Sequence, residues 1–365
     1  MIFEILFVAV LVSMACAIPG VFLVLRKMSL MSDAISHAVL PGIVLGFLLT
    51  HSLSSPLLFI GAVFTGILTV FLSELLVKTS LVKEDAAIGL VFPVLFSIGV
   101  ILVSLFTGDV HLDTDAVLLG ELVFTPLDRI SVMGWDLGPR MAWIMGLILL
   151  INLSILFLLF KELKLATFDK GLATSLGFSP VLIQYILMTD VSITTVGAFD
   201  AVGSILVVAL IVAPASAAYL LTDDLKMMVL LSIIIGVLSS ISGFYVAWFM
   251  DASASGAIAG MCGVFFLLAF LFAPSRGIVV QYQRKRGQKL DFAMTLLTVH
   301  IMHHQGKTEE INECSVNHLT QHINWDSVFA KSVVTQAQRK GLINIVKGII
   351  TLTSEGRERA DQAMI

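Results

Sequence analysis

The sequence predicts an all-α polytopic membrane protein with eight or nine transmembrane helices, followed by a small α+β cytoplasmic domain. Of the 365 residues, 58% are hydrophobic and only 13% are charged, and the mean hydropathy is +0.99. Uncharged apolar stretches long enough to cross a bilayer recur as far as about residue 273. From about residue 289 these stretches stop, and charged residues of both signs replace them.

The apolar stretches have lengths near the roughly 20 residues that a transmembrane helix requires. Eight are uninterrupted, at about residues 5–25, 34–50, 56–73, 86–106, 141–160, 202–221, 227–250 and 252–273. A ninth, residues 181–199, contains Asp190 near its middle. If one early stretch is re-entrant or merges with its neighbour, eight crossings remain.

Basic residues in the loops predict the orientation. With nine crossings, only Arg129 and Arg140 lie on one side of the membrane. The other side then holds twelve basic residues: Arg26, Lys27, Lys78, Lys83, Lys161, Lys164, Lys170, Lys226, Arg276, Arg284, Lys285 and Arg286. Because basic loops stay in the cytoplasm, this distribution predicts an external N-terminus and a cytoplasmic C-terminus.

Asp33 and His37 are the first candidate functional residues. Their i, i+4 spacing in "SDAISHA" places them on one face of a helix. A carboxylate oxygen and an imidazole nitrogen suit Mn²⁺, Fe²⁺ or Zn²⁺, and ionisable groups within membrane segments are usually functional. The alternative is structural: Asp33 caps the second helix and His37 bonds a neighbouring backbone group. Nine crossings put Asp33 toward the cytoplasmic end of its helix, whereas eight place it nearer the outer mouth.

Two further features of the membrane region are candidates. Asp190 is an ionisable residue within a span, so it is a weaker candidate metal contact, with a hydrogen-bonding role as the alternative. The polar connector 161–180, "KELKLATFDKGLATSLGFSP", contains a short helical piece that ends at Gly177. It is either an ordinary amphipathic connector or a rigid element that carries force from a soluble partner.

No G-x-x-x-x-G-K-[ST] motif occurs in the sequence, so the chain has no P-loop for a nucleotide. We therefore expect a non-enzymatic chain without a permanently bound cofactor. If ATP drives transport, another chain hydrolyses it.

Together these features resemble the permease family of bacterial ABC importers for manganese, zinc and iron. The resemblance covers about residues 5–275. It rests on "GVFLVLRKMSLMSDAISHAVLPGIVLGFLL" (20–49), "KEDAAIGLVFPVLFSIGVIL" (83–102), "HLDTDAVLLGEL" (111–122), "FDKGLATSLGF" (168–178) and "VGAFDAVGSILVVALIVAPASAAYLLT" (196–222).

The resemblance implies a multi-pass protein of the bacterial inner membrane that works with cytosolic ABC ATPases and an extracytoplasmic metal-binding protein. It also implies a homodimer or a pair with a sister permease. Asp33 and His37 would line the path of the transported metal, and residues 169–178 would form the coupling helix that docks on the ATPase. The candidate docking residues are Phe168, Asp169, Leu172, Ala173, Gly177 and Phe178.

The C-terminal region, residues 289–365, predicts helices at 291–304, 308–322 and 325–340 and then a two-stranded hairpin around Lys347–Gly348. This order resembles the winged-helix domain of metal-dependent iron and manganese repressors. The region carries eight basic and eight acidic residues, however, so it lacks the basic surface that DNA binding requires. We therefore expect no nucleic-acid partner.

Histidines are concentrated in this region. His300, His303 and His304 share a predicted helix, and His318 and His322 form an i, i+4 pair. Imidazole is a common ligand of transition metals, so these five residues predict a regulatory metal site. The alternative is a polar helix surface that happens to be rich in histidine.

The sequence therefore predicts a permease domain (1–275), a basic linker (276–288) and a cytoplasmic winged-helix-like domain (289–365). The expected function is ATP-driven import of a divalent transition metal, manganese first and iron or zinc next, with a regulatory tail. The alternatives are a secondary metal transporter without an ATPase and a membrane-tethered, metal-responsive DNA-binding regulator.

Overall fold

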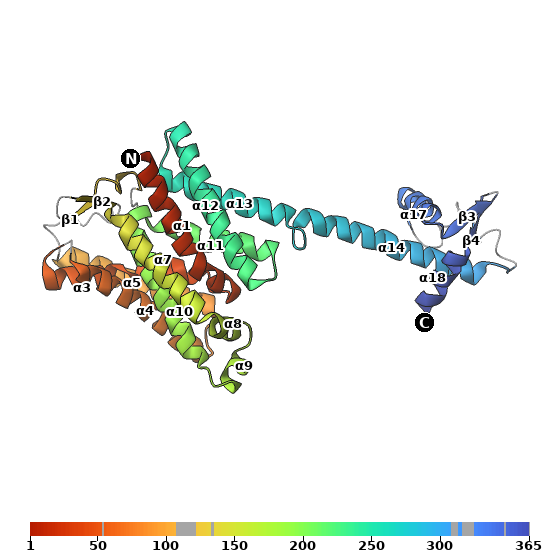
Figure 1. The fold of residues 1–365 in the computed structure, drawn as a ribbon. Helices are drawn as coiled ribbons and strands as arrows, with labels where there is room; N and C mark the ends of the chain where they lie inside the picture. The colour runs from red at the N-terminus through yellow and green to blue at the C-terminus, as the bar shows by residue number, and fades with distance from the viewer. Residues whose placement is uncertain are drawn as a thin grey trace. The chain divides into compact units, whose positions relative to one another are not determined.

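The structure of the protein, a computed structural model, describes residues 1–52, 55–106, 122–132, 135–307, 313–315, 325–346 and 348–364 (Figure 1). These residues divide into two compact units, Met1–Gly277 and Ile278–Ile365. The histidines His318 and His322 and most of the helix predicted at 308–322 lie outside the described residues.

The N-terminal unit is helical, as the sequence predicts. Within the described ranges, nine segments are long and apolar enough to cross a membrane, and α2 and α3 together form one of them. The helices are α1 (Ile2–Leu25), α2 (Leu30–Ala38), α3 (Leu40–Thr50), α4 (Pro56–Lys78), α5 (Glu84–Phe106), α7 (Arg140–Leu158), α10 (Pro180–Val202), α11 (Ser204–Leu221), α12 (Leu225–Met250) and α13 (Ala254–Phe272). The connections include η1 (Leu122–Phe124), the antiparallel strands β1 (Arg129–Val132) and β2 (Trp135–Pro139), and the short helices α8 (Phe160–Phe168) and α9 (Lys170–Ser175).

Helix α1 is the most buried of these spans and packs against α7, α10, α11 and α12 (Figure 1). Lipid is as apolar as a leucine side chain, so polar contacts and close packing must hold such helices together. Asn152 of α7 supplies one such contact, because its Nδ2 donates to the Ala15 carbonyl oxygen at 2.9 Å and to Thr194 Oγ1 at 3.0 Å. One buried amide thereby joins α1, α7 and α10.

The second span is interrupted between α2 and α3. Pro41 lies in the first turn of α3 and has no backbone N–H, so it cannot donate to the carbonyl of His37 as a continuous helix would require. Glycines let neighbouring helices cover the interruption: Gly42 of α3 and Gly61 of α4 meet backbone to backbone, and Gly99 of α5 lies against Pro41. A Cβ atom at Gly42 would overlap the Gly61 carbonyl oxygen.

In the residues that the structure describes, the C-terminal unit combines three helices with a hairpin. It contains α14 (Ile278–His304), α17 (Ser327–Arg339), β3 (Ile343–Val346), β4 (Ile349–Leu352) and α18 (Ser354–Met364). The predicted hairpin is present, with Ile343 paired to Leu352 and Val346 to Ile349. Helix α14 begins earlier than the predicted residue 291 and contains the basic residues Arg284, Lys285 and Arg286, which the sequence placed in a linker.

The apolar core of this unit lies between α14, α17 and the hairpin. Leu297 and Ile301 of α14 pack with Val333 of α17 and with Ile343 and Ile350 of the strands, and all five side chains are fully buried. Asp291 adds an ionic contact at the edge of this core. Lys340 Nζ lies 3.0 Å from Asp291 Oδ1, and Arg359 Nη2 lies 2.8 Å from Asp291 Oδ2. The carboxylate therefore joins α14 to the end of α17 and to α18.

The close approach of α3 and α4 gives a test of stability. We expect Gly42→Ala to lower the free energy of unfolding by about 1–3 kcal/mol, because the added methyl group forces the two backbones apart. Gly89→Ala is the matched control, since a Cβ at this exposed glycine of α5 meets no atom within 4 Å. Thermal unfolding of the purified protein in detergent measures both; equal unfolding temperatures for the two variants would contradict the packing.

Asp291 predicts a pH dependence for the C-terminal unit. The hydrogen bonds from Lys340 and Arg359 lower the pKa of Asp291 below its usual value. A lowered folded-state pKa gives stabilisation that is present above the unfolded-state pKa and is lost as the pH falls through the folded-state value. Hydrogen exchange of α18 amides in the full chain, corrected for intrinsic rates, should therefore accelerate below about pH 4.

In Asp291→Asn, α18 should exchange faster at neutral pH and lose this pH dependence. Asp361→Asn, a change at an exposed position of α18 itself, serves as the control. A wild-type exchange profile in Asp291→Asn would show that the ion pairs do not hold α18.

Candidate functional site

Asp33 and His37 lie one turn apart on the short helix α2. His37 Nε2 is 3.5 Å from Asp33 Oδ1, and 34% of the His37 side chain and 45% of the Asp33 side chain are exposed. Their neighbours Ala34, Ile35 and Ser36 are buried. One face of α2 therefore packs into the protein, and the other presents a carboxylate and an imidazole that remain accessible to an ion.

The structural alternative for Asp33 is wrong. Helix α2 begins at Leu30, four residues before the apolar stretch from which the sequence predicted it, and its N-cap position is Ser29. Asp33 therefore lies within the helix. The ring of His37 lies against Phe92 and Phe96 of α5, with ring centroids 6.0 and 6.3 Å apart. These aromatic rings restrict where the imidazole can point.

Asp190 does not share a ligand group with Asp33 and His37. It is 3% exposed on α10, and its Oδ1 has no hydrogen-bond partner in the described part of the protein. Helix α10 packs against both α2 and α4. Within the described ranges, Asp33, His37 and Asp190 do not form a group of three ligand atoms close enough to hold one ion.

A second polar contact between spans was missed by the sequence analysis. Tyr185 Oη of α10 donates to Glu74 Oε2 of α4 at 2.8 Å, and Gln184 Nε2 donates to the other carboxylate oxygen. A glutamate directly after an apolar stretch was the available signal. It did not identify its partners, because they come from a helix more than a hundred residues later in the chain.

The polar connector forms the helices α8 and α9, so the predicted short helical piece is present. Asp169 caps α9, since its Oδ1 accepts a hydrogen bond from the Leu172 N–H at 2.9 Å. Gly177 ends the turn with φ of +86°, a conformation that glycine adopts without strain. The Phe178 N–H then bonds the carbonyl of Ala173.

The connector exposes apolar side chains on a polar segment. Phe168 is 60% exposed and Leu172 is 46% exposed, whereas Ala173 is fully buried and Phe178 is partly buried. Leu176, which the sequence analysis did not select, is also exposed. Phe168, Leu172 and Leu176 thus present apolar surface. Asp169, Ala173 and Gly177 shape the segment that carries these side chains.

Arg26 connects this segment to the first two spans. It follows the last residue of α1, and its Nε donates to Thr167 Oγ1 at 3.1 Å, near the end of α8. Only residues 27–29 separate Arg26 from the first turn of α2. The connector is thereby joined by one side chain to the turn that leads to Asp33 and His37.

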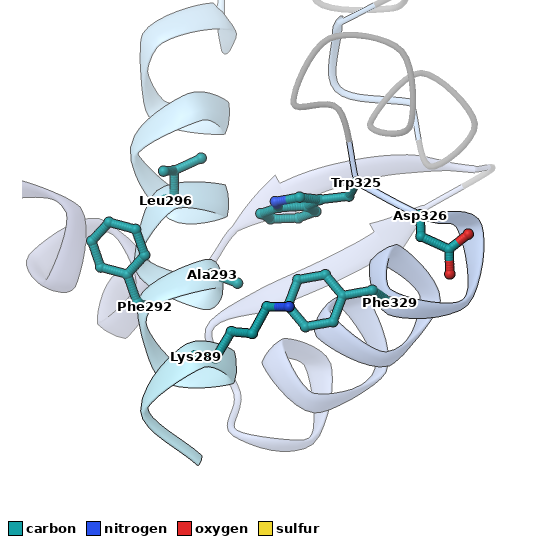
Figure 2. A pocket seen from close by; sticks show the side chains of 7 residues that line it. All are labelled: Lys289, Phe292, Ala293, Leu296, Trp325, Asp326 and Phe329. Carbon is teal, nitrogen blue, oxygen red and sulfur yellow. The ribbon is translucent and has the colours of Figure 1, made fainter. Parts of the chain in front are cut away.

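The C-terminal unit contains the remaining candidates on α14. His300 and His304 are partly buried, whereas His303 is exposed and its Nε2 lies 3.5 Å from Lys307 Nζ. The same unit has a pocket of about 250 Å³ (Figure 2). Its lining residues are Lys289, Phe292, Ala293, Leu296, Trp325, Asp326 and Phe329. None of the histidines lines this pocket, which is smaller than most ligand sites.

Comparison with known proteins identifies the family. Residues 1–273 match the ABC 3 transport family. The chain is 52% identical over 356 residues to the zinc transport system membrane protein TroD of Treponema pallidum, covering 98% of this chain and 97% of that protein. It is 46% identical over 275 residues to the manganese transport system membrane protein MntD of Bacillus subtilis, covering 75% of this chain and 93% of that protein.

A solved structure agrees with these matches. PsaBC from Streptococcus pneumoniae in complex with Fab superposes with a TM-score of 0.64 at 30% identity, covering 78% of this chain and 94% of that chain. The Treponema protein thus matches almost the full length, including most of the C-terminal unit. With its nine candidate spans, the chain is a multi-pass membrane protein that belongs to the ABC 3 transport family.

Proposed function

We propose that this chain is the membrane-spanning permease of an ATP-driven importer of a divalent transition metal, with manganese the first expected substrate and zinc or iron next. The observation that carries the proposal is the accessible Asp33–His37 pair on a helix interrupted within a span. Membership of the ABC 3 transport family supports it, as do the zinc and manganese transport named for the two relatives.

The proposed path uses α2 to replace part of the ion's hydration shell. The Asp33 carboxylate and the His37 imidazole offer one oxygen and one nitrogen ligand, a set that manganese, iron and zinc accept. The His37 carbonyl lies where Pro41 removes the normal helical donor, and such interrupted backbones contact ions in other transporter folds. Asp190 remains a second candidate contact, at a different point of an alternating-access cycle.

The proposed coupling runs through the connector. A partner ATPase would dock on α9 and the residues beside it, through Phe168, Asp169, Leu172, Ala173, Gly177 and Phe178. The exposed apolar side chains of Phe168 and Leu172 support this role, because apolar groups on a polar segment are typical of interaction sites. The Arg26–Thr167 hydrogen bond then offers a route from α8 to α2.

The proposed complex contains cytosolic ABC ATPases, an extracytoplasmic metal-binding protein, and a second copy of this chain or a sister permease. Metal is cargo in this scheme, and ATP hydrolysis belongs to the partner. For the C-terminal unit we propose a cytoplasmic location, a winged-helix-like arrangement and a regulatory role. Its balanced charge disfavours DNA binding, and the family assignment disfavours a secondary transporter.

The metal path is tested by uptake into proteoliposomes that contain the permease and its ATPase. We expect Asp33→Ala and His37→Ala each to lower the initial rate of manganese, zinc or iron uptake by at least about tenfold, because each removes a ligand. The control is His51→Asn at the end of the same span, where the residue has φ of +51° and asparagine tolerates that conformation.

Unchanged uptake of all three metals in both Ala variants would refute the path. ATPase activity of the same samples shows whether the complex has assembled. Uptake that continues without ATP would instead support a secondary transporter.

The coupling element is tested at Asp169. Asp169→Ala removes the cap of α9, at a cost of about 1 kcal/mol, whereas Asp169→Asn retains a capping oxygen without the charge. We expect the Ala variant to co-purify with less of the ATPase subunit and to import metal more slowly. The Asn variant should behave close to wild type in both measurements. Equal losses in the two variants would rule out the capping role.

A further inference from the structure

We propose that His300, His304 and Glu313 form a binding site for a divalent transition metal in the C-terminal unit, separate from the Asp33–His37 pair. One ligand atom from each of the three side chains lies within 4.8 Å of the other two. Among the described residues, this is the one group of three metal-ligating side chains gathered so closely. The regulatory meaning of the site rests on the proposed function, whereas binding itself does not.

The three ligands come from two segments. His300 and His304 lie one turn apart on α14, with ring centroids 4.8 Å apart. Glu313 lies beyond the end of α14, and its backbone carbonyl is 3.3 Å from His300 Nε2. The chain therefore folds back after α14 and brings Glu313 to the two histidines. Residue spacing along a single helix could not supply this third ligand.

Burial favours a built site over a polar surface. All three residues are partly buried, and the Nδ1 atom of His304 is buried without a hydrogen-bond partner in the described part of the unit. A buried imidazole nitrogen without a partner carries a free-energy cost that a metal–nitrogen bond would remove. His303, adjacent in sequence, is exposed and lies outside the group.

The Glu313 segment is fixed to the hairpin. Ser315 forms a bridge with Ile349, and the Ile350 N–H donates to the Cys314 carbonyl at 2.9 Å. A metal held by all three side chains would therefore link the C-terminal end of α14 to the edge strand β4. The ligand set also defines the cation: two imidazoles and one carboxylate suit Zn²⁺, Co²⁺, Fe²⁺ or Mn²⁺, and not Mg²⁺ or Ca²⁺, which prefer oxygen ligands.

The experiment uses the full-length protein in detergent and Co²⁺ as the probe, because its visible absorption reports nitrogen ligation. We expect His300→Ala/His304→Ala to lose one equivalent of bound Co²⁺ together with its absorption band. Glu313→Gln, which keeps the shape of the side chain, should weaken Co²⁺ binding by at least about tenfold. Its agreement with the double variant excludes misfolding as the cause of the loss.

His303→Ala is the matched control on the same helix and should retain the full absorption band. His37→Ala should retain the part of the band that the double variant loses, which separates this site from the proposed metal path. The proposal is overturned if the double variant and Glu313→Gln bind Co²⁺ as wild type does. It is equally overturned if His303→Ala loses as much as the double variant, because the histidines would then act as a nonspecific surface.

Discussion

Pro41 imposes the constraint on which the proposed metal path depends. Because it lacks a backbone N–H, Pro41 removes the hydrogen bond to the His37 carbonyl at the point where α2 ends and α3 begins. An interrupted backbone at membrane depth is tolerated only where protein covers it. The glycine contacts of α3 with α4 and of α5 with Pro41 supply this cover. The cover leaves the face with Asp33 and His37 accessible while the opposite face of α2 is buried.

The same region receives the connection from the polar connector. Helix α8 reaches Arg26 through one hydrogen bond, and Arg26 stands at the end of α1 just before the turn into α2. A displacement of α8 and α9 therefore acts close to the base of the helix that carries the candidate ligands. Asn152 and Glu74 link other spans through buried or partly buried polar contacts. These contacts would hold those spans together while α8 and α9 move.

The sequence was sufficient for features that depend on local composition. The spans follow from apolar length, the connector from its polarity and the stop at Gly177, and the hairpin from alternation around Gly348. The sequence was insufficient for features that depend on tertiary packing. Helix α2 begins at Leu30 because Met31 and Ser32 are buried by neighbouring helices, which hydropathy does not register. Spacing alone also could not separate His303 from His304 or bring Glu313 to them, since that requires the chain to fold back.

The central claim is that His37 contacts the metal during ATP-driven import. It is tested most directly by pulsed EPR of Mn²⁺ trapped in the complex of this chain with a hydrolysis-deficient ATPase. The background is His300→Ala/His304→Ala, which removes the second proposed site. The account predicts a nitrogen modulation from a bound imidazole that disappears when His37→Gln is added. An unchanged nitrogen modulation in the His37→Gln complex would contradict it.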